Sequence, residues 1–109
     1  MKVVIEPRVY DVMYDFYALS CRIHLSLELS TCLAKIERLE RAMKMFADYA
    51  EVMHKQPYRN DWKELGYKEF VTEDFHFAYK VYVLPSGEKV LCFHDAIYSK
   101  LNYNPEDKN

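Results

Sequence analysis

The residues of this sequence best suited to chemistry are a histidine and a tyrosine four positions apart. His94 ends a long alternating run, and Tyr98 follows it. A histidine can take up or release a proton near neutral pH, so it can act as a general acid or base. The pair could equally be the plain close of a hairpin. The choice between these interpretations depends on which face of the sheet carries His94.

The cysteines offer no comparable pattern. Cys21, Cys32 and Cys92 are odd in number and widely spaced, and the sequence has neither a C-x-x-C motif nor paired histidines. This spacing argues against a zinc site or a disulfide framework. We expect three buried, reduced thiols, and neither a metal nor a cofactor.

Length and composition indicate one small packed domain. Of the 109 residues, half are hydrophobic and 16% are aromatic, and only two are glycine. The formal net charge is −2, so a nucleic acid could be held only by a local basic patch. With no signal peptide and no membrane-spanning apolar run, we expect a cytoplasmic protein. Residues 1–104 are expected to form the domain, and residues 105–109 a frayed tail.

The N-terminal half is predicted to begin with a short strand and a helix. Residues 2–6 form a β-branched run that stops at Pro7, and proline is well suited to the first turn of a helix. That helix is expected to end near Cys21. Residues 22–30 combine an alternating pattern with the start of a helical one, and we expect a connection there.

The second helix is predicted to be long. From Leu29 onward, apolar residues recur at the 3.6-residue period as far as Met53, and Pro57 supplies the stop. Glu51 and Lys55 would form a favourable i,i+4 ion pair near the end of this helix.

Three strands are predicted in the C-terminal half, over residues 69–72, 75–84 and 89–94, because these runs are rich in apolar and aromatic residues. Residues 56–68 before them are expected to be a polar loop, pinned to the core by Trp62. The order is β-α-α-β-β-β. It predicts a two-layer α+β fold in which the two N-terminal helices pack on one face of a mainly antiparallel sheet.

The turn between the last two strands sets their register. Leu84-Pro85-Ser86-Gly87 fits a type I turn followed by Gly87 in the left-handed conformation. Such a loop would pair Tyr79 with Phe93. A two-residue loop would shift the register by one residue, which would reverse the faces of every side chain in the last strand.

In the favoured register His94 lies beside Ala78 on the face that the helices leave open, whereas in the shifted register it would be buried. We expect Tyr98 to curl over the end of the open face. The same face would carry three further side chains: His76, Lys80 and Tyr82. An uncovered surface of this kind suits a partner or a substrate.

With these elements in place, the sequence resembles the RelE/ParE superfamily of bacterial toxins from toxin–antitoxin pairs. The resemblance covers residues 1–104 and rests on the order of the elements together with local marks. These marks are Asp61-Trp62-Lys63, Glu73-Asp74-Phe75, Tyr79-Lys80, and His94 followed by Tyr98. The set is most similar to the branch that cleaves mRNA on the ribosome.

The resemblance implies a toxin that acts as a ribosome-dependent mRNA endoribonuclease, without a metal. His94 would be the general acid or base, Asp74 would assist or orient it, and Tyr98 would stack on a base or position the phosphate. Four cations are candidates for contact with phosphate: Lys80, Lys63, Lys68 and Arg59. The implied partners are a cognate antitoxin, the ribosome and mRNA, and the oligomeric state, including a homodimer, stays open.

Plainer alternatives stay open for the same features. Asp74 could be an ordinary turn residue, and Lys80 could simply be solvated. For the protein as a whole, the alternatives are a non-catalytic or gyrase-directed protein-binding toxin of the same fold, and a housekeeping domain. The lack of histidine in residues 56–71 and the acidic balance favour protein binding. His94 with Tyr98 favours the nuclease.

Overall fold

The computed structural model of the protein describes residues 1–23, 29–53 and 55–98. Within these residues the chain forms an α+β fold with three α-helices, a short 3-10 helix and a four-stranded sheet. The tail predicted for residues 105–109 and most of the connection predicted for 22–30 lie outside the described residues. No helix in the described part is long and apolar enough to cross a membrane.

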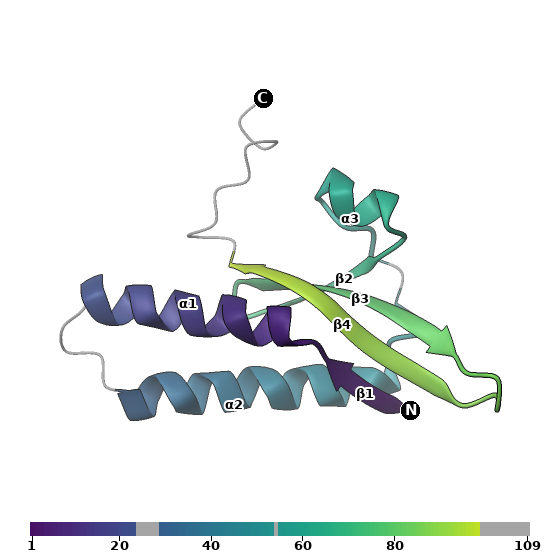
Figure 1. The fold of residues 1–109 in the computed structure, drawn as a ribbon, viewed down its shortest axis with the longest axis horizontal. Coiled ribbons are helices and arrows are strands. Elements are labelled where there is room, and N and C mark those ends of the chain that lie inside the picture. The colour runs from purple at the N-terminus through teal and green to yellow at the C-terminus, as the bar shows by residue number, and fades with distance from the viewer. Residues whose placement is uncertain (24–28, 54, 99–109) are drawn as a thin grey trace.

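The sheet is mixed and has the strand order β1-β4-β3-β2. β3 (Phe75–Val83) is antiparallel to β2 (Lys68–Thr72) on one side and to β4 (Lys89–Tyr98) on the other. β1 (Lys2–Ile5) is parallel to β4, so the first strand lies directly beside the last (Figure 1). The prediction of a mainly antiparallel sheet therefore holds for two of the three strand pairs.

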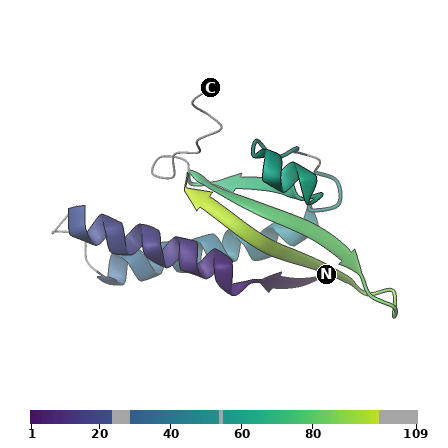
Figure 2. The ribbon, with the colours of Figure 1, turned by 45° about the horizontal axis from the view of Figure 1, so that its top comes forward.

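Two long helices cover one face of the sheet. α1 (Pro7–Ile23) begins at the predicted proline, and α2 (Leu29–Met45) packs beside it, as Figures 1 and 2 show. The core between the helices and the sheet is built from aliphatic and aromatic side chains that are almost completely buried: Val9, Met13, Ile36, Leu39, Met43, Phe77, Tyr79, Leu91 and Phe93.

α2 is shorter than predicted. It ends at Met45, and the chain continues as a 3-10 helix, η1 (Phe46–Asp48), and then as turns. The buried phenol of Tyr79 in β3 donates to the carbonyl oxygens of Ala50 and Met53, at 3.4 and 3.2 Å. These carbonyls accept a hydrogen bond from Tyr79, whereas in a longer helix they would accept from backbone N–H groups. Packing against β3 therefore overrides the helical pattern of the sequence.

The ion pair predicted inside this helix is also replaced by longer-range pairs. Glu51 lies 2.6 Å from the ammonium of Lys89 at the start of β4. Lys55 instead lies 3.4 Å from the buried carboxylate of Glu69 in β2. The charges that would have supported a longer helix therefore tie the segment after α2 to the sheet.

The turn between β3 and β4 has the predicted geometry. The backbone N–H of Gly87 donates to the carbonyl of Leu84, and the N–H of Leu84 donates to the carbonyl of Glu88, both at 2.8 Å. Gly87 has a φ of +88°, the left-handed conformation that the sequence required of it. The predicted pairing of Tyr79 with Phe93 is confirmed.

β4 contains a β-bulge that the sequence pattern did not reveal. Ala78 pairs with Asp95 rather than with the predicted His94, and the register shifts between Ala78 and Tyr79. His94 is thus the extra residue of the strand. A bulge of this kind bends the strand and redirects the side chains that follow it.

The residues after the bulge occupy the opposite face from the one predicted. Ala96 is completely buried in the core. Tyr98 stacks on Phe16 of α1 with a centroid distance of 4.0 Å, and it also meets Phe75 edge to face. The expectation that Tyr98 curls over the open face was wrong. It assumed that side chains alternate strictly between the two faces along β4, and the bulge at His94 changes the faces of the residues that follow it.

The face opposite the two long helices is only partly open. Residues 56–68, predicted as a loop, contain the short helix α3 (Asn60–Glu64), which lies on the other side of the sheet from α1 and α2 (Figure 2). A helix of five residues is too short to leave a periodic signal in the sequence. Its Trp62 is 1% exposed, so this residue anchors the segment, as predicted.

Gly87→Ala tests the turn that sets the register. A Cβ at this φ strains the backbone, and we expect the free energy of unfolding to fall by about 1 kcal/mol. Urea unfolding measures the change. Glu88→Ala, at the neighbouring exposed position, should stay within about 0.5 kcal/mol of the wild type. Equal losses in the two variants would contradict the assigned turn.

Candidate functional site

Five side chains gather on the face of the sheet that lies away from α1 and α2. They come from the residue after β1, the residue before β2, the end of β3 and the middle of β4. We call this group the His94 cluster: Glu6, Tyr67, Tyr82, Cys92 and His94. The prediction that His94 faces away from the long helices is confirmed, since its hydrogen-bond partners belong to this group and not to the core.

Both nitrogens of the His94 ring are engaged. Nδ1 lies 2.5 Å from Oε1 of Glu6, and Nε2 lies 2.8 Å from the hydroxyl of Tyr82. A carboxylate oxygen accepts, so Nδ1 carries a hydrogen and donates it to Glu6, and in the neutral form of the ring Nε2 then accepts from the Tyr82 hydroxyl. The ring also stacks on Tyr67, with centroids 4.8 Å apart and planes at 11°. The imidazole is therefore fixed in tautomer and in orientation.

Cys92 is the most buried member of the cluster. Its Sγ lies 3.5 Å from Oε1 of Glu6 and 3.8 Å from Nδ1 of His94. Burial, followed by the hydrogen bond to Glu6 and the charge of that carboxylate, raises the pKa of the Cys92 thiol to about 11. The thiol therefore stays protonated at neutral pH and is a poor nucleophile as it stands. Cys32 is also free and buried, as predicted, while the side chain of Cys21 lies outside the described part.

The two tyrosines keep their protons as well. Burial is the main cause that raises the pKa of Tyr67 and of Tyr82, and the nearby carboxylate of Glu6 adds to both shifts. Tyr82 is still 39% exposed, so its phenol lies at the border between the cluster and solvent. The cluster thus presents the Tyr82 hydroxyl to solvent, with the His94 imidazole directly behind it.

One side of the cluster is bounded by α3. The indole N–H of Trp62 donates to Oδ2 of Asp95 at 3.1 Å, and the guanidinium of Arg8 donates to Oδ1 at 3.2 Å. Asp95 follows His94 in the bulge, so the same irregularity that orients the histidine also holds the helix over the sheet. The buried indole of Trp62 therefore links α3 to β4.

Of the predicted phosphate contacts, Arg59 is already engaged within α3. Its guanidinium makes two hydrogen bonds to Asp61, at 2.9 and 2.8 Å, and lies over the ring of Trp62. These hydrogen bonds are the main reason why the pKa of Asp61 is lowered. Arg59 and Asp61 therefore stabilise the short helix. Lys63 is exposed on the same helix.

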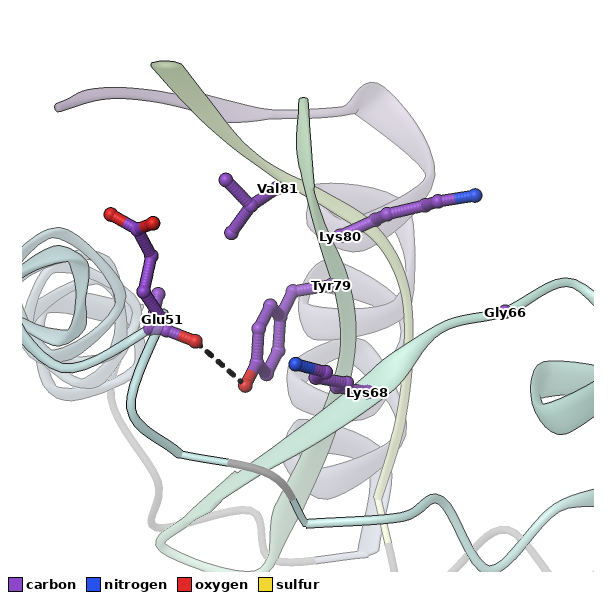
Figure 3. Close-up of a pocket in the computed structure, with 7 residues that line it drawn as sticks. Glu51, Gly66, Lys68, Tyr79, Lys80 and Val81 are labelled. Atoms are coloured by element: carbon purple, nitrogen blue, oxygen red, sulfur yellow. Dashed lines mark hydrogen bonds between the residues drawn. The ribbon is translucent and has the colours of Figure 1, made fainter. Parts of the chain in front are cut away.

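The two lysines predicted in the strands lie on opposite faces. Lys80 pairs with Cys92, and its ammonium is 5.7 Å from the centroid of the Tyr82 ring, so it borders the His94 cluster. Lys68 pairs with Tyr79 and lines a cavity of about 320 Å³. Lys80 lines the same cavity, but Figure 3 shows Lys68 directed toward Tyr79 and Lys80 extending from β3 in another direction. Of the four predicted cations, Lys80 is thus the one that the structure brings to His94.

The other two predicted catalytic residues are not brought to His94. Asp74 lies in the two-residue turn between β2 and β3, where Glu73 and Asp74 have φ values of 48° and 69°. Asp74 lies four positions along the chain, roughly 13 Å, from Ala78, which pairs with Asp95 next to His94. Arg38 of α2 holds the neighbouring Glu73 by an ion pair of 2.6 Å. The interpretation of Asp74 as a turn residue is confirmed, and Tyr98 faces α1.

Glu6, Tyr67 and Cys92 are the site residues that the sequence reasoning missed. Cys92 and His94 are two apart in one strand, a spacing that places both side chains on one face. Glu6 joins them because Val4 pairs with Cys92 in the parallel β1–β4 ladder. The first signal was available in the sequence, but the second required the pairing of the first strand with the last.

The sequence matches no protein-family model and no curated protein.

Asp95→Ala should weaken the cover formed by α3. The buried indole N–H of Trp62 would lose its acceptor, which costs about 1–3 kcal/mol. Urea unfolding followed by tryptophan fluorescence measures this, because Trp62 is the sole tryptophan of the chain. Arg8→Ala is the matched control: its side chain is 63% exposed, so the loss should stay under about 1 kcal/mol. A smaller effect for Asp95→Ala than for Arg8→Ala would contradict this account.

Proposed function

We propose that this protein is a toxin of the RelE/ParE type that cleaves mRNA on the ribosome, with His94 as a metal-independent acid–base residue. The observation that carries the proposal is the Glu6–His94 pair on the sheet face away from the long helices. A carboxylate that accepts from Nδ1 holds the other ring nitrogen ready for proton transfer, the arrangement found in many acid–base sites.

The chemistry requires one proton acceptor and one donor. Nε2 of His94 would remove the proton from a ribose 2′-hydroxyl, and the 2′-oxygen would attack the adjacent phosphorus. The bond from phosphorus to the 5′-oxygen then breaks, and the imidazolium returns its proton to the leaving oxygen. The products are a 2′,3′-cyclic phosphate and a 5′-hydroxyl end. Glu6 would stabilise the imidazolium formed between the two steps.

A hydroxyl already occupies the position that the mechanism needs. The Tyr82 Oη lies 2.8 Å from Nε2, so a ribose hydroxyl that takes its place would meet the same nitrogen. Tyr82 lies near the solvent-exposed end of β3, where its ring can turn aside to make room. Tyr67 and Tyr82 would then offer aromatic faces to unstacked bases, the usual way in which proteins hold single-stranded RNA.

In this proposal two predicted roles pass to other residues. Glu6 takes the orienting role that the resemblance implied for Asp74, and the cluster tyrosines take the place of Tyr98. Lys80 keeps its predicted role, because its ammonium lies over the Tyr82 ring at the border of the cluster. The proposal thus rests on residues that contact His94, and on Lys80, which contacts Tyr82.

The fold is compatible with the proposal. The described elements run β1, α1, α2, η1, α3, β2, β3 and β4, so they agree with the order that the resemblance implies in the two long helices and the strands but not in the helical segments between α2 and β2. The short helix α3 is an addition between the second long helix and β2. A cytoplasmic location belongs to the same proposal, since the target is mRNA on the ribosome.

A second candidate function is a protein-binding toxin that does not cleave RNA. The observation that favours it is a set of exposed apolar side chains along α2 and the turns after it: Leu29, Leu33, Met45, Tyr49 and Val52. Exposed apolar side chains of this extent suit a protein partner. An antitoxin bound there would also fit the nuclease proposal, so cleavage itself has to decide between the two.

His94→Ala should abolish cleavage. When the protein is expressed and mRNA ends are mapped, the wild type should produce new 5′-hydroxyl ends. Loss of the acid–base group should reduce their number at least about a hundredfold, and Glu6→Gln should reduce it by roughly tenfold or more. His76→Ala is the control, because this histidine on β3 lies 3.3 Å from Glu69 rather than in the cluster. Growth arrest without new ends would support the protein-binding alternative.

Lys80→Ala should weaken cleavage more than Lys63→Ala. A lost contact with a phosphate of about 1.4 kcal/mol corresponds to a tenfold slower rate, while the exposed Lys63 on α3 should change the rate by less than about threefold. The rate at which mapped ends accumulate after induction gives both values. Equal effects of the two substitutions would remove Lys80 from the proposed site.

A further inference from the structure

We propose that Glu6, Cys92 and His94 form a binding site for a zinc ion. The three side chains offer a carboxylate oxygen, a sulfur and an imidazole nitrogen, and these ligand atoms all lie within 4.8 Å of one another. This donor set of thiolate, imidazole and carboxylate is the one from which zinc sites are built.

The distances fit a tetrahedral ion along two of the three edges. Ligand atoms about 2.0–2.3 Å from a tetrahedral zinc lie roughly 3.3–3.6 Å apart. The Sγ of Cys92 is 3.5 Å from the Glu6 oxygen and 3.8 Å from Nδ1 of His94. These two separations need almost no adjustment.

The third edge, between Glu6 and His94, is occupied by a hydrogen bond. Oε1 of Glu6 and Nδ1 of His94 are 2.5 Å apart, so they have to separate by roughly 0.8 Å to admit the ion. The Glu6 side chain is 40% exposed and follows the end of β1, so it can rotate outward while His94 and Cys92 stay in place. Zinc would thus replace the proton that Glu6 and His94 now share.

The surroundings of His94 suit a metal ligand as well as a base. A histidine bound to zinc through Nδ1 carries its hydrogen on Nε2 and usually donates it to a neighbouring group. The Tyr82 oxygen lies 2.8 Å from Nε2 and can accept that hydrogen once its own hydroxyl turns away. Stacking on Tyr67 holds the His94 ring in the orientation that directs Nδ1 toward Glu6 and Cys92.

With three protein ligands, the ion would keep a fourth position toward solvent on the side of Glu6. The effect of zinc on RNA cleavage rests on the proposed function. Bound zinc would be coordinated by both the Glu6 carboxylate and Nδ1 of His94. The imidazole could then no longer shuttle a proton, so zinc would inhibit cleavage. The binding itself can be tested without reference to any activity.

Titration of the purified full-length chain with Co²⁺ tests the site. A cobalt ion bound to a thiolate has a sulfur-to-metal charge-transfer absorption. We expect this absorption to saturate at one ion per chain and to disappear when Zn²⁺ is added. Cys92→Ser should remove the absorption, and Tyr82→Phe should weaken binding by about tenfold, through loss of the group that contacts Nε2.

The controls separate this site from other thiols and from misfolding. Cys32→Ala removes a buried core thiol outside the cluster and should leave the absorption unchanged. Glu6→Gln changes a partly exposed side chain, so the variant should fold, and it should bind at least tenfold more weakly. Absence of the absorption in the wild type, or full binding by Cys92→Ser, would overturn the proposal. Loss of zinc inhibition in a variant that still cleaves would leave the nuclease proposal intact.

Discussion

The arrangement of the site depends on one irregularity, the β-bulge at His94. Up to Phe93, β4 alternates between the helix layer and the opposite face, and its Leu91 and Phe93 complete the core. The extra residue places His94 and Asp95 one after the other without interrupting the sheet, so the two side chains reach different partners: Glu6 and Tyr82 for one, Trp62 for the other. Bulges often re-aim side chains beside functional sites.

The second constraint is the parallel pairing of β1 with β4. It is the only pairing of the described strands that joins the two ends of the chain, and it brings a carboxylate from residue 6 to an imidazole at residue 94. Pro7 is the first residue of α1, so the helix starts directly after Glu6. The position of Glu6 is therefore set from two sides, by the ladder before it and the helix after it.

The sequence predicted what local chemistry determines and missed what distant packing determines. The start of α1 at Pro7 and the left-handed Gly87 followed from the residues themselves. The end of α2 did not, because the hydroxyl of Tyr79 takes the carbonyls of a segment whose pattern was still helical. His94 was placed on the correct face, but Tyr98 was not, since a bulge leaves no mark in an alternating pattern. Glu6 required knowledge of a parallel pairing across the whole chain.

A purely structural role explains the His94 cluster poorly. The hydrogen bond between His94 and Glu6 replaces hydrogen bonds that both groups would make with water, so its net contribution to stability is small. A thiol held against a carboxylate is less favourable than an apolar side chain in the same place. Aliphatic residues at positions 6, 92 and 94 would strengthen a sheet more. A carboxylate, a thiol and an imidazole that converge on one point instead form a place where a proton or a metal ion can be held. The choice between these two occupants lies with Glu6, whose carboxylate either keeps the proton on Nδ1 or turns outward to admit the metal.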